Sequence, residues 1–239
     1  MTALARVVVV CGLLGAASQL PLAVASASVT PSSEMRAVIA AADGERSVKV
    51  VSTGSLGSVR LTITGTAGIG SGTQKIDYDL DGVSHYVQIV LVNDVVYVEG
   101  DATVLEKYMG LKTNEAKAVA GKWFKMFSNV SDYAAVSAGL TVDSVVSAIT
   151  MSGAIRALAN QKLDGKSVVA LVGHSVASSV NGPSLPETLY AAARGKPLPI
   201  KVVQTESGHT GTITFADWNQ AFAVGVPSTT LTFQSSWLS

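Results

Sequence analysis

The stretch "QKIDYDLDGVSHYVQIVLVNDVVYVEG", residues 74–100, decides the fold of this chain. Apolar and polar side chains alternate along its first part, which is typical of a strand with one buried face. The Asp-Gly pair at residues 81–82 is a common two-residue hairpin turn, and the Asn-Asp pair at residues 93–94 turns the chain again. The stretch therefore predicts three consecutive antiparallel strands.

The same alternation extends along the chain on both sides of this stretch. Residues 46–65 predict two more strands, broken at Gly54 and Gly57, and a glycine-rich hairpin loop at residues 65–73 follows them. After a middle part with few strand signals, the alternation returns in residues 166–173, 187–206 and 211–218, with a turn at 194–196. Five strands are thus expected before the middle part, and about five after it.

Helical patterns occupy the start of the domain and its middle part. Ser33 can cap a short helix that closes near Gly44. In the middle part, residues 101–158, Asp143 can cap a further helix over residues 144–160. The apolar stripe of that helix consists of Val145, Val146, Ile149 and, beyond Gly153, Ile155. Such a stripe is expected to pack on a sheet.

The order of these elements predicts the fold class. Strands do not alternate with crossover helices, which disfavours a parallel, doubly wound sheet. We expect a single α+β domain over residues 28–239, in which a large curved antiparallel sheet, a half-barrel, wraps over a group of helices.

The first 27 residues are expected to be an export signal. Arg6 gives a short basic start, residues 7–20 are almost wholly apolar, and residues 25–27 are small. The alternative is an uncleaved membrane anchor, which needs about 20 apolar residues. Gln19 and Pro21 interrupt the apolar run, so cleavage and export to the cell envelope or beyond are expected.

The single cysteine, Cys11, lies inside the apolar run and is followed by more apolar chain. A lipid-attachment cysteine would stand at the end of that run, so lipid anchoring is not expected. With the signal removed no cysteine remains, which excludes disulfides and cysteine-based metal or redox chemistry in the mature domain.

Charge is scarce and balanced, with 17 basic and 17 acidic side chains. This balance gives no indication of a basic surface for nucleic acid, and no nucleic-acid partner is expected. Charged residues make up only 14% of the chain and hydrophobic residues 48%, where about a quarter of an ordinary chain is charged. A soluble exported protein of this composition has an unusually large core or lines an internal apolar space.

The segment "GHSVA" at residues 173–177 resembles the nucleophile elbow of an α/β-hydrolase, with Ser175 as the nucleophile. The only downstream histidine, His209, precedes Asp217 instead of following it, and the turn at residues 163–166 predicts an antiparallel neighbour. Ser175 is therefore expected to be a serine at the end of a strand, and the protein is not expected to be an enzyme.

No cofactor or metal site is predicted. The GxGxG run within residues 65–72 leads into a strand, whereas a dinucleotide-binding loop opens a helix. The histidines, His85, His174 and His209, lie on separate segments without metal-ligand spacing. The carboxylates of Asp77, Asp79 and Asp81 share one face of a strand and are expected to be solvated.

Five phrases between residues 95 and 227 resemble a known family by their order and spacing. They are "VVYVEG", "YMGLKTNEAKAVAGKWFKM", "LDGKSVVALVG", "ETLYAAARGKPLPIKVV" and "GTITFADWNQAFAVGVP". The chain is similar to the LppX/LprG-like mycobacterial cell-envelope proteins, whose fold is related to the LolA lipoprotein carriers. The resemblance implies a half-barrel whose apolar cavity accepts acyl chains of lipids or glycolipids, and it implies no catalytic residues.

The expected function is a non-enzymatic extracytoplasmic carrier or binder of lipid or glycolipid, with envelope membrane or transport proteins as further candidate partners. The alternative is a protein-interaction or sensory domain without a transported ligand. The cavity is expected between the sheet and the helices, although the same side chains could also pack into a filled core. The candidate lining residues are Ile76, Tyr78, Leu80, Val87, Ile89 and Leu91 on the strands, and Val145, Val146 and Ile149 on a helix.

Overall fold

The computed structural model describes residues 31–56, 59–107, 109–177, 184–206, 209–228 and 230–238. The expected export signal, residues 1–27 with Cys11, lies outside the described residues. Within the described ranges, no helix is long and apolar enough to cross a membrane.

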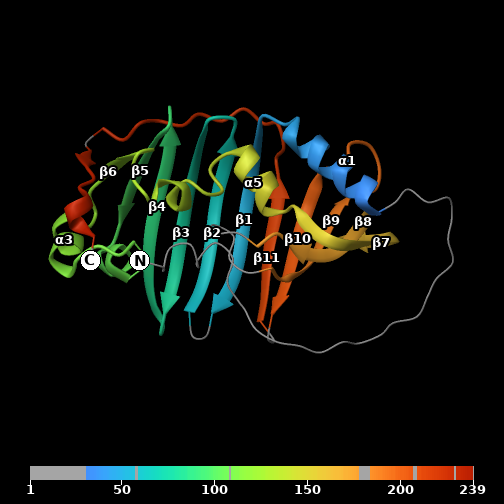
Figure 1. The fold of residues 1–239 in the computed structure, drawn as a ribbon, viewed down its shortest axis with the longest axis horizontal. Helices are drawn as coiled ribbons and strands as arrows, with labels where there is room; N and C mark the ends of the chain where they lie inside the picture. The colour runs from blue at the N-terminus through green and yellow to red at the C-terminus, as the bar shows by residue number, and fades with distance from the viewer. Residues whose placement is uncertain are drawn as a thin grey trace.

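A twelve-stranded curved sheet forms the body of the molecule (Figure 1). Its strand order is β12-β6-β5-β4-β3-β2-β1-β11-β10-β9-β8-β7, and every pair is antiparallel except β12 with β6. The strands are β1 Ser47–Leu56, β2 Val59–Gly68, β3 Ser71–Leu80, β4 Val83–Val92, β5 Val95–Gly100, β6 Phe124–Phe127, β7 Met151–Leu163, β8 Lys166–Ser175, β9 Pro186–Ala192, β10 Pro199–Glu206, β11 His209–Ala216 and β12 Leu231–Thr232.

Tight turns explain why sequence neighbours pair. At residues 81–82, 93–94 and 164–165 both turn residues have positive φ, as a two-residue hairpin of the favoured hand requires. Asp, Asn and Gly tolerate that backbone conformation better than other residues do. The hairpins expected at these three positions are confirmed.

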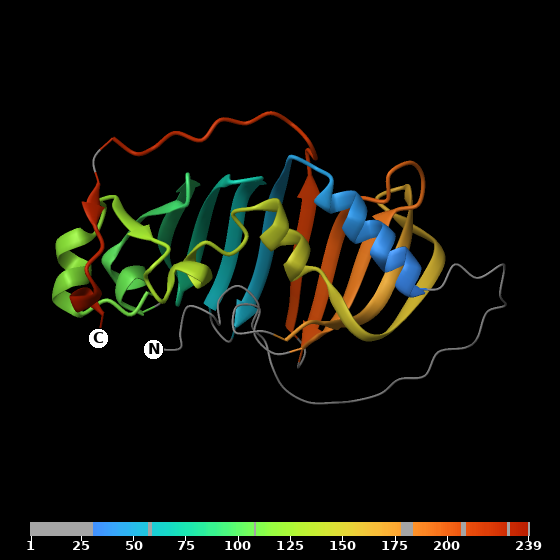
Figure 2. The same ribbon diagram turned by 45° about the horizontal axis from the view of Figure 1, so that its top comes forward.

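Two meanders, β1–β5 and β7–β11, make up most of the sheet. They join through β1 and β11, which pair from Lys49–Ala216 to Thr53–Thr212 although they are far apart in the sequence. After β11 the chain passes across the ends of the strands to β12. There β12 pairs with β6 at one end of the strand order (Figure 2). The two halves therefore form one continuous surface.

The helices lie on one face of this sheet, with α1 and α5 over its centre and its β7 side (Figure 2). Their bounds are α1 Pro31–Asp43, α2 Ala102–Lys107, α3 Thr113–Val119, α4 Tyr133–Val136 and α5 Val142–Ala148, followed by the 3-10 helix η2 Ser235–Trp237. The α+β class and the curved sheet over helices are as predicted.

The core consists of two clusters of buried side chains. The first joins β3–β6 to α2 and α3, with Phe124 and Leu105 at its centre. The second joins α1 and α5 to the other half of the sheet, with Leu171 and Leu189 fully buried. Each half of the sheet thus has its own helices and its own apolar packing.

One predicted element is wrong. The helix expected over residues 144–160 ends at Ala148, and Met151–Leu163 is the long strand β7. Gly153 has φ of 71°, which no α-helix accommodates, and the hairpin at residues 164–165 pairs this segment with β8. Ile155 has the spacing of the helical stripe in the sequence, but it lies on strand β7 in the structure. The cap is also shifted, since Thr141 and not Asp143 caps α5.

Candidate ligand cavity

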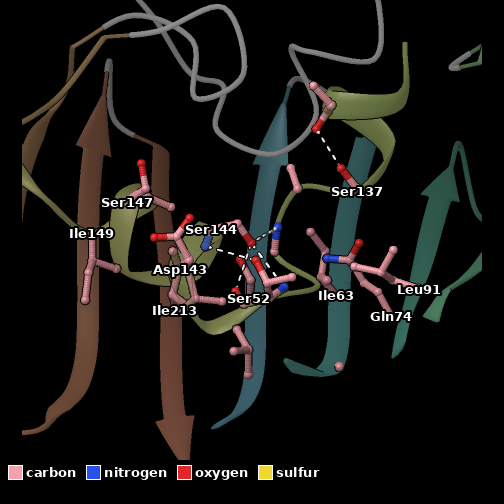
Figure 3. Close-up of a pocket in the computed structure, with 18 of the residues that line it drawn as sticks. Ser52, Ile63, Gln74, Leu91, Ser137, Asp143, Ser144, Ser147, Ile149 and Ile213 are labelled. Carbon is pink, nitrogen blue, oxygen red and sulfur yellow. Dashed lines mark hydrogen bonds between the residues drawn. The ribbon is translucent and has the colours of Figure 1, made fainter. Parts of the chain in front are cut away.

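A cavity of about 590 Å³ lies between the sheet and the segment that contains α4 and α5 (Figure 3). Its floor comes from four neighbouring strands in the first meander and from β11. Its cover comes from residues 133–149. The floor residues are Val50, Ser52, Ile63, Gly65, Gln74, Leu91, Ile213 and Phe215, and the cover includes Tyr133, Ser137, Thr141, Ser144, Val145 and Ile149.

The strand registers explain how these floor residues come together. Val50 pairs with Gly65 on one side and with Phe215 on the other. Two residues further along β1, Ser52 pairs with Ile63 and Ile213. Because alternate side chains of a strand point to the same face, both rows face the helices. Glycine at position 65 contributes no side chain, so it leaves space in the floor.

The cover is held directly against the sheet backbone at its centre. A Cβ atom added to Gly72 would lie 2.0 Å from the carbonyl oxygen of Leu140, so only glycine admits this contact. Next to it, Gly68 and Thr141 form an isolated parallel bridge. These two contacts fix the height of the cover above β2 and β3.

A capping box at the start of α5 satisfies the polar groups of the cover. The Ser144 N–H donates to Thr141 Oγ1 at 3.2 Å, and the Thr141 N–H donates to Ser144 Oγ at 3.2 Å. The Gly139 N–H also donates to Ser144 Oγ at 3.0 Å. The loop before α5 is thereby rigidly attached to the helix.

The cavity is mainly apolar on the sheet side, where Ser52 and Gln74 are polar floor residues, and it is partly polar at its edge. The Tyr133 hydroxyl donates to the Asp94 carbonyl at 2.9 Å, which ties α4 to the turn between β4 and β5. Burial raises the pKa of the Tyr133 phenol, and the Asp94 carboxylate raises it further. A ligand here would therefore meet mainly hydrocarbon from the strands, with the polar side chains of Ser52 and Gln74, and hydroxyl groups from the cover.

Three of the nine predicted lining residues, Leu91, Val145 and Ile149, line this cavity. The other six lie in the packed clusters. Ile76, Tyr78, Val87 and Ile89 are buried in the first cluster, Leu80 packs against it, and Val146 is buried in the second. For these six, contact with a ligand stays a prediction.

The sequence interpretation missed the contribution of β1, β2 and β11. Val50, Ile63, Ile213 and Phe215 form much of the floor. Their alternation was visible in the sequence, but no local signal indicates that β1 and β11 are neighbours. A pairing between strands about 160 residues apart is decided by the tertiary fold.

Ser175 has a structural contact that accounts for its place in the sheet. It is buried at the end of β8, where its Oγ accepts a hydrogen bond of 3.0 Å from the Leu185 N–H. Its own N–H donates to the Leu185 carbonyl at 2.9 Å. The β8–β9 pair is antiparallel, unlike the sheet of an α/β-hydrolase. The hydroxyl thus joins β8 to the chain entering β9.

Two of the other titratable groups singled out in the sequence, His85 and Asp77, have local partners. His85 Nδ1 lies 3.2 Å from Asp101 Oδ1, and Asp101 also accepts the N–H groups of Thr103 and Val104 at the start of α2. Lys75 pairs with Asp77 at 2.7 Å. Among the residues that the structure describes, no three His, Cys, Asp or Glu side chains gather in a group that could hold a metal ion.

Comparison with known proteins gives matches to solved structures. No protein-family model matches the sequence, and no curated protein matches it. The crystal structure of LprF from Mycobacterium bovis matches with a TM-score of 0.53 and 14% identity, covering 82% of this chain and 96% of LprF. Lipoprotein LppX from Mycobacterium tuberculosis matches with a TM-score of 0.47 and 17% identity, covering 82% of this chain and 98% of LppX.

The likeness to LprF, at this identity, shows a shared fold. LprF is a mycobacterial protein of the LppX/LprG family. The fold that the sequence resemblance implied is therefore confirmed.

Proposed function

We propose that this chain is a non-enzymatic extracytoplasmic protein that binds a lipid or glycolipid, with an acyl chain held in the cavity between the sheet and residues 133–149. The observation that carries the proposal is the cavity of about 590 Å³ with its apolar floor. Sites for small molecules usually measure about 300–1,000 Å³ and are lined mainly by apolar side chains with a few polar groups. The resemblance to LppX/LprG-like proteins supports the same ligand class.

The energetics favour a hydrocarbon chain. Burying a methylene group contributes about 0.8 kcal/mol, so about ten methylenes contribute roughly 8 kcal/mol before the costs of association. The cover places hydroxyl groups at the edge of the cavity, and these can form hydrogen bonds with the polar end of such a ligand. No covalent step is needed for this function.

Extraction tests the ligand class. The protein, expressed without residues 1–27 and purified, is extracted with organic solvent, and the extract is analysed by mass spectrometry. Acylated molecules in amounts comparable to the protein are expected. An empty extract, together with no binding of the uncharged apolar fluorophore N-phenyl-1-naphthylamine, would contradict the proposal.

A substitution in the floor tests the site. Ser52→Phe places a large side chain in the cavity, so we expect fluorophore affinity to fall at least about tenfold, which corresponds to 1.4 kcal/mol. Thr53→Phe is the matched control, because Thr53 is exposed on the opposite face of the same strand. Equal affinities for Ser52→Phe and the wild type, with both proteins folded by circular dichroism, would place the ligand elsewhere.

A further inference from the structure

Glu187 is a buried acid with an unused hydrogen-bonding atom. Its side chain is 2% exposed and shares a face of β9 with the buried residues Leu189 and Ala191. Glu187 Oε2 accepts a hydrogen bond of 2.7 Å from Gln204 Nε2 on β10. Among the residues that the structure describes, Glu187 Oε1 is buried and has no hydrogen-bond partner. A buried oxygen without a partner is costly, and it needs an explanation.

The strand registers place this acid in a row that crosses five strands. Glu187 pairs with Gln204 and with Gly173, and Gln204 pairs with Gly211. Gly54 of β1 follows next, since a Cβ atom added to it would lie 3.9 Å from Gly211 Cα. The other three residues of this row are glycines, so Glu187 and Gln204 are the two residues in it that carry a side chain.

No described residue covers one end of this row, whereas β7 closes the other end. A Cβ atom added to Gly54 or Gly211 would meet no atom of the described part of the chain nearer than 3.9 Å. At Gly173, by contrast, such an atom would lie 3.2 Å from Met151 Sδ and 3.5 Å from Ile155 Cγ1, both on β7. Space is therefore available next to the Gln204 side of the acid, and β7 closes the far side.

The uncovered end borders the cavity. Ser52 and Ile213 are floor residues of the cavity, and they precede or follow Gly54 and Gly211 by two positions on the same strands. Two residues along a strand span roughly 6.5 Å and return to the same face. A ligand in the cavity can therefore extend over the two glycines toward Glu187.

The chemistry of the acid favours an uncharged partner with hydroxyl groups. Burial raises the pKa of Glu187 to about 7, and the Gln204 hydrogen bond lowers it by less. The carboxyl group can thus accept a hydrogen bond when ionised and donate one when protonated. A hydroxyl group complements both forms, whereas a phosphate or carboxylate would be repelled by the ionised form.

We propose that Glu187 and Gln204 form a polar subsite that binds the hydroxyl-bearing head of an uncharged lipid whose chain lies in the cavity. This inference rests on the proposed function, because the acyl chain brings the head to the row. Glu187 Oε1 supplies the free hydrogen-bonding position, and Gly54 and Gly211 leave room for the head.

Two matched probes test the subsite. 1-Monopalmitoylglycerol carries two hydroxyl groups, and methyl palmitate has the same acyl chain with none. Their affinities are measured by displacement of N-phenyl-1-naphthylamine from the protein without residues 1–27, at pH 7. We expect the wild type to bind 1-monopalmitoylglycerol about tenfold more tightly than methyl palmitate, the size of effect that a good hydrogen bond gives.

Substitutions then assign the preference to Glu187. Glu187→Leu should remove the preference while methyl palmitate binding is kept, and Glu187→Gln should retain it because an amide both donates and accepts. Gln204→Leu, which should weaken the preference, serves if Glu187→Leu does not fold. The matched control is Glu99→Leu, since Glu99 lies on the other face of the sheet, bonded to the Tyr86 hydroxyl.

The possible results separate this inference from the proposed function. Equal binding of the two probes by the wild type, or a preference that persists in Glu187→Leu, overturns the subsite alone. Binding of neither probe overturns the proposed function and the subsite together.

Discussion

Glu187 links the interior of the sheet to solution pH. Burial raises its pKa from an ordinary value of 4.5 to about 7. Below pH 4.5 Glu187 is protonated in both the folded and the unfolded chain, so its burial costs no ionisation energy and the free energy of unfolding is highest with respect to this group. Between these values only the folded chain keeps the proton, so this group lowers the free energy of unfolding as pH rises, by roughly 3 kcal/mol in all.

Urea unfolding at several pH values checks this prediction. Glu187→Gln removes the titrating group, so the variant should gain stability relative to the wild type as pH rises from about 4.5 to about 7. Above that range the difference should stay constant. A difference that does not change with pH would mean that Glu187 titrates normally in the folded protein.

The strength of a residue's sequence signal does not predict its role in the structure. Ser175 sits in an elbow-like pentapeptide, yet its Oγ accepts a hydrogen bond from the Leu185 N–H. Glu187 had no distinguishing sequence signal, because an acid followed by alternating apolar residues is common at the start of a strand. Its importance arises from the neighbours that the sheet places around it.

At the level of elements, the contact between Gly72 and the segment before α5 determines the height of the cavity cover. Gly72→Ala would place Cβ 2.0 Å from the Leu140 carbonyl oxygen, so the segment must move away. We expect the free energy of unfolding to fall by about 1–3 kcal/mol, as overpacking usually does. Urea unfolding measures this loss, and fluorophore titration should show weaker binding.

Gly70→Ala is the control for this prediction. Gly70 lies in the same hairpin, and a Cβ atom added there meets no atom of the described residues within 4 Å. Its effect on stability should stay within about 0.5 kcal/mol. Equal unfolding midpoints for the two variants would show that the cover adjusts freely.

The mistaken helix over residues 144–160 also belongs to this scale. Val145 and Val146 do lie on the buried face of α5, and Ile149, the residue at its C-cap, is buried in the same cluster. Beyond them, a positive φ at Gly153 and a hairpin at residues 164–165 convert the chain to a strand. An apolar stripe at helical spacing correctly predicts the packing of α5. Beyond Ile149, however, the same residues can pair with β8, and that pairing determines their conformation.

At the scale of the whole molecule, the cavity lies where the two core clusters meet. Ile63 and Leu91 belong to the first cluster, and Val145, Ile149 and Phe215 belong to the second. A bound hydrocarbon chain would therefore contact both halves of the apolar interior. Its binding energy would add to the stability of the entire fold.

Thermal unfolding with and without ligand checks this consequence. A ligand that binds only the folded chain adds about 2.7 kcal/mol when present at one hundred times its dissociation constant. N-Phenyl-1-naphthylamine should therefore raise the unfolding temperature of the wild type in a concentration-dependent way. Ser52→Phe should show a clearly smaller rise at the same fluorophore concentration, because its affinity is lower. A rise of equal size in that variant would contradict binding in this cavity.

The sequence by itself determined the first meander, strands β8–β11 of the second, their tight turns and the α+β class, because these depend on side-chain alternation and on turn residues that are adjacent in the chain. It also indicated an apolar interior and three of the residues that line the cavity. Only the tertiary structure decided the β1–β11 pairing, the cavity floor and the position of Glu187 beside two glycines. Those features depend on contacts between segments that are distant in the sequence. Strand register and the distance between backbones determine which atoms meet there, and the local sequence pattern carries no information about either.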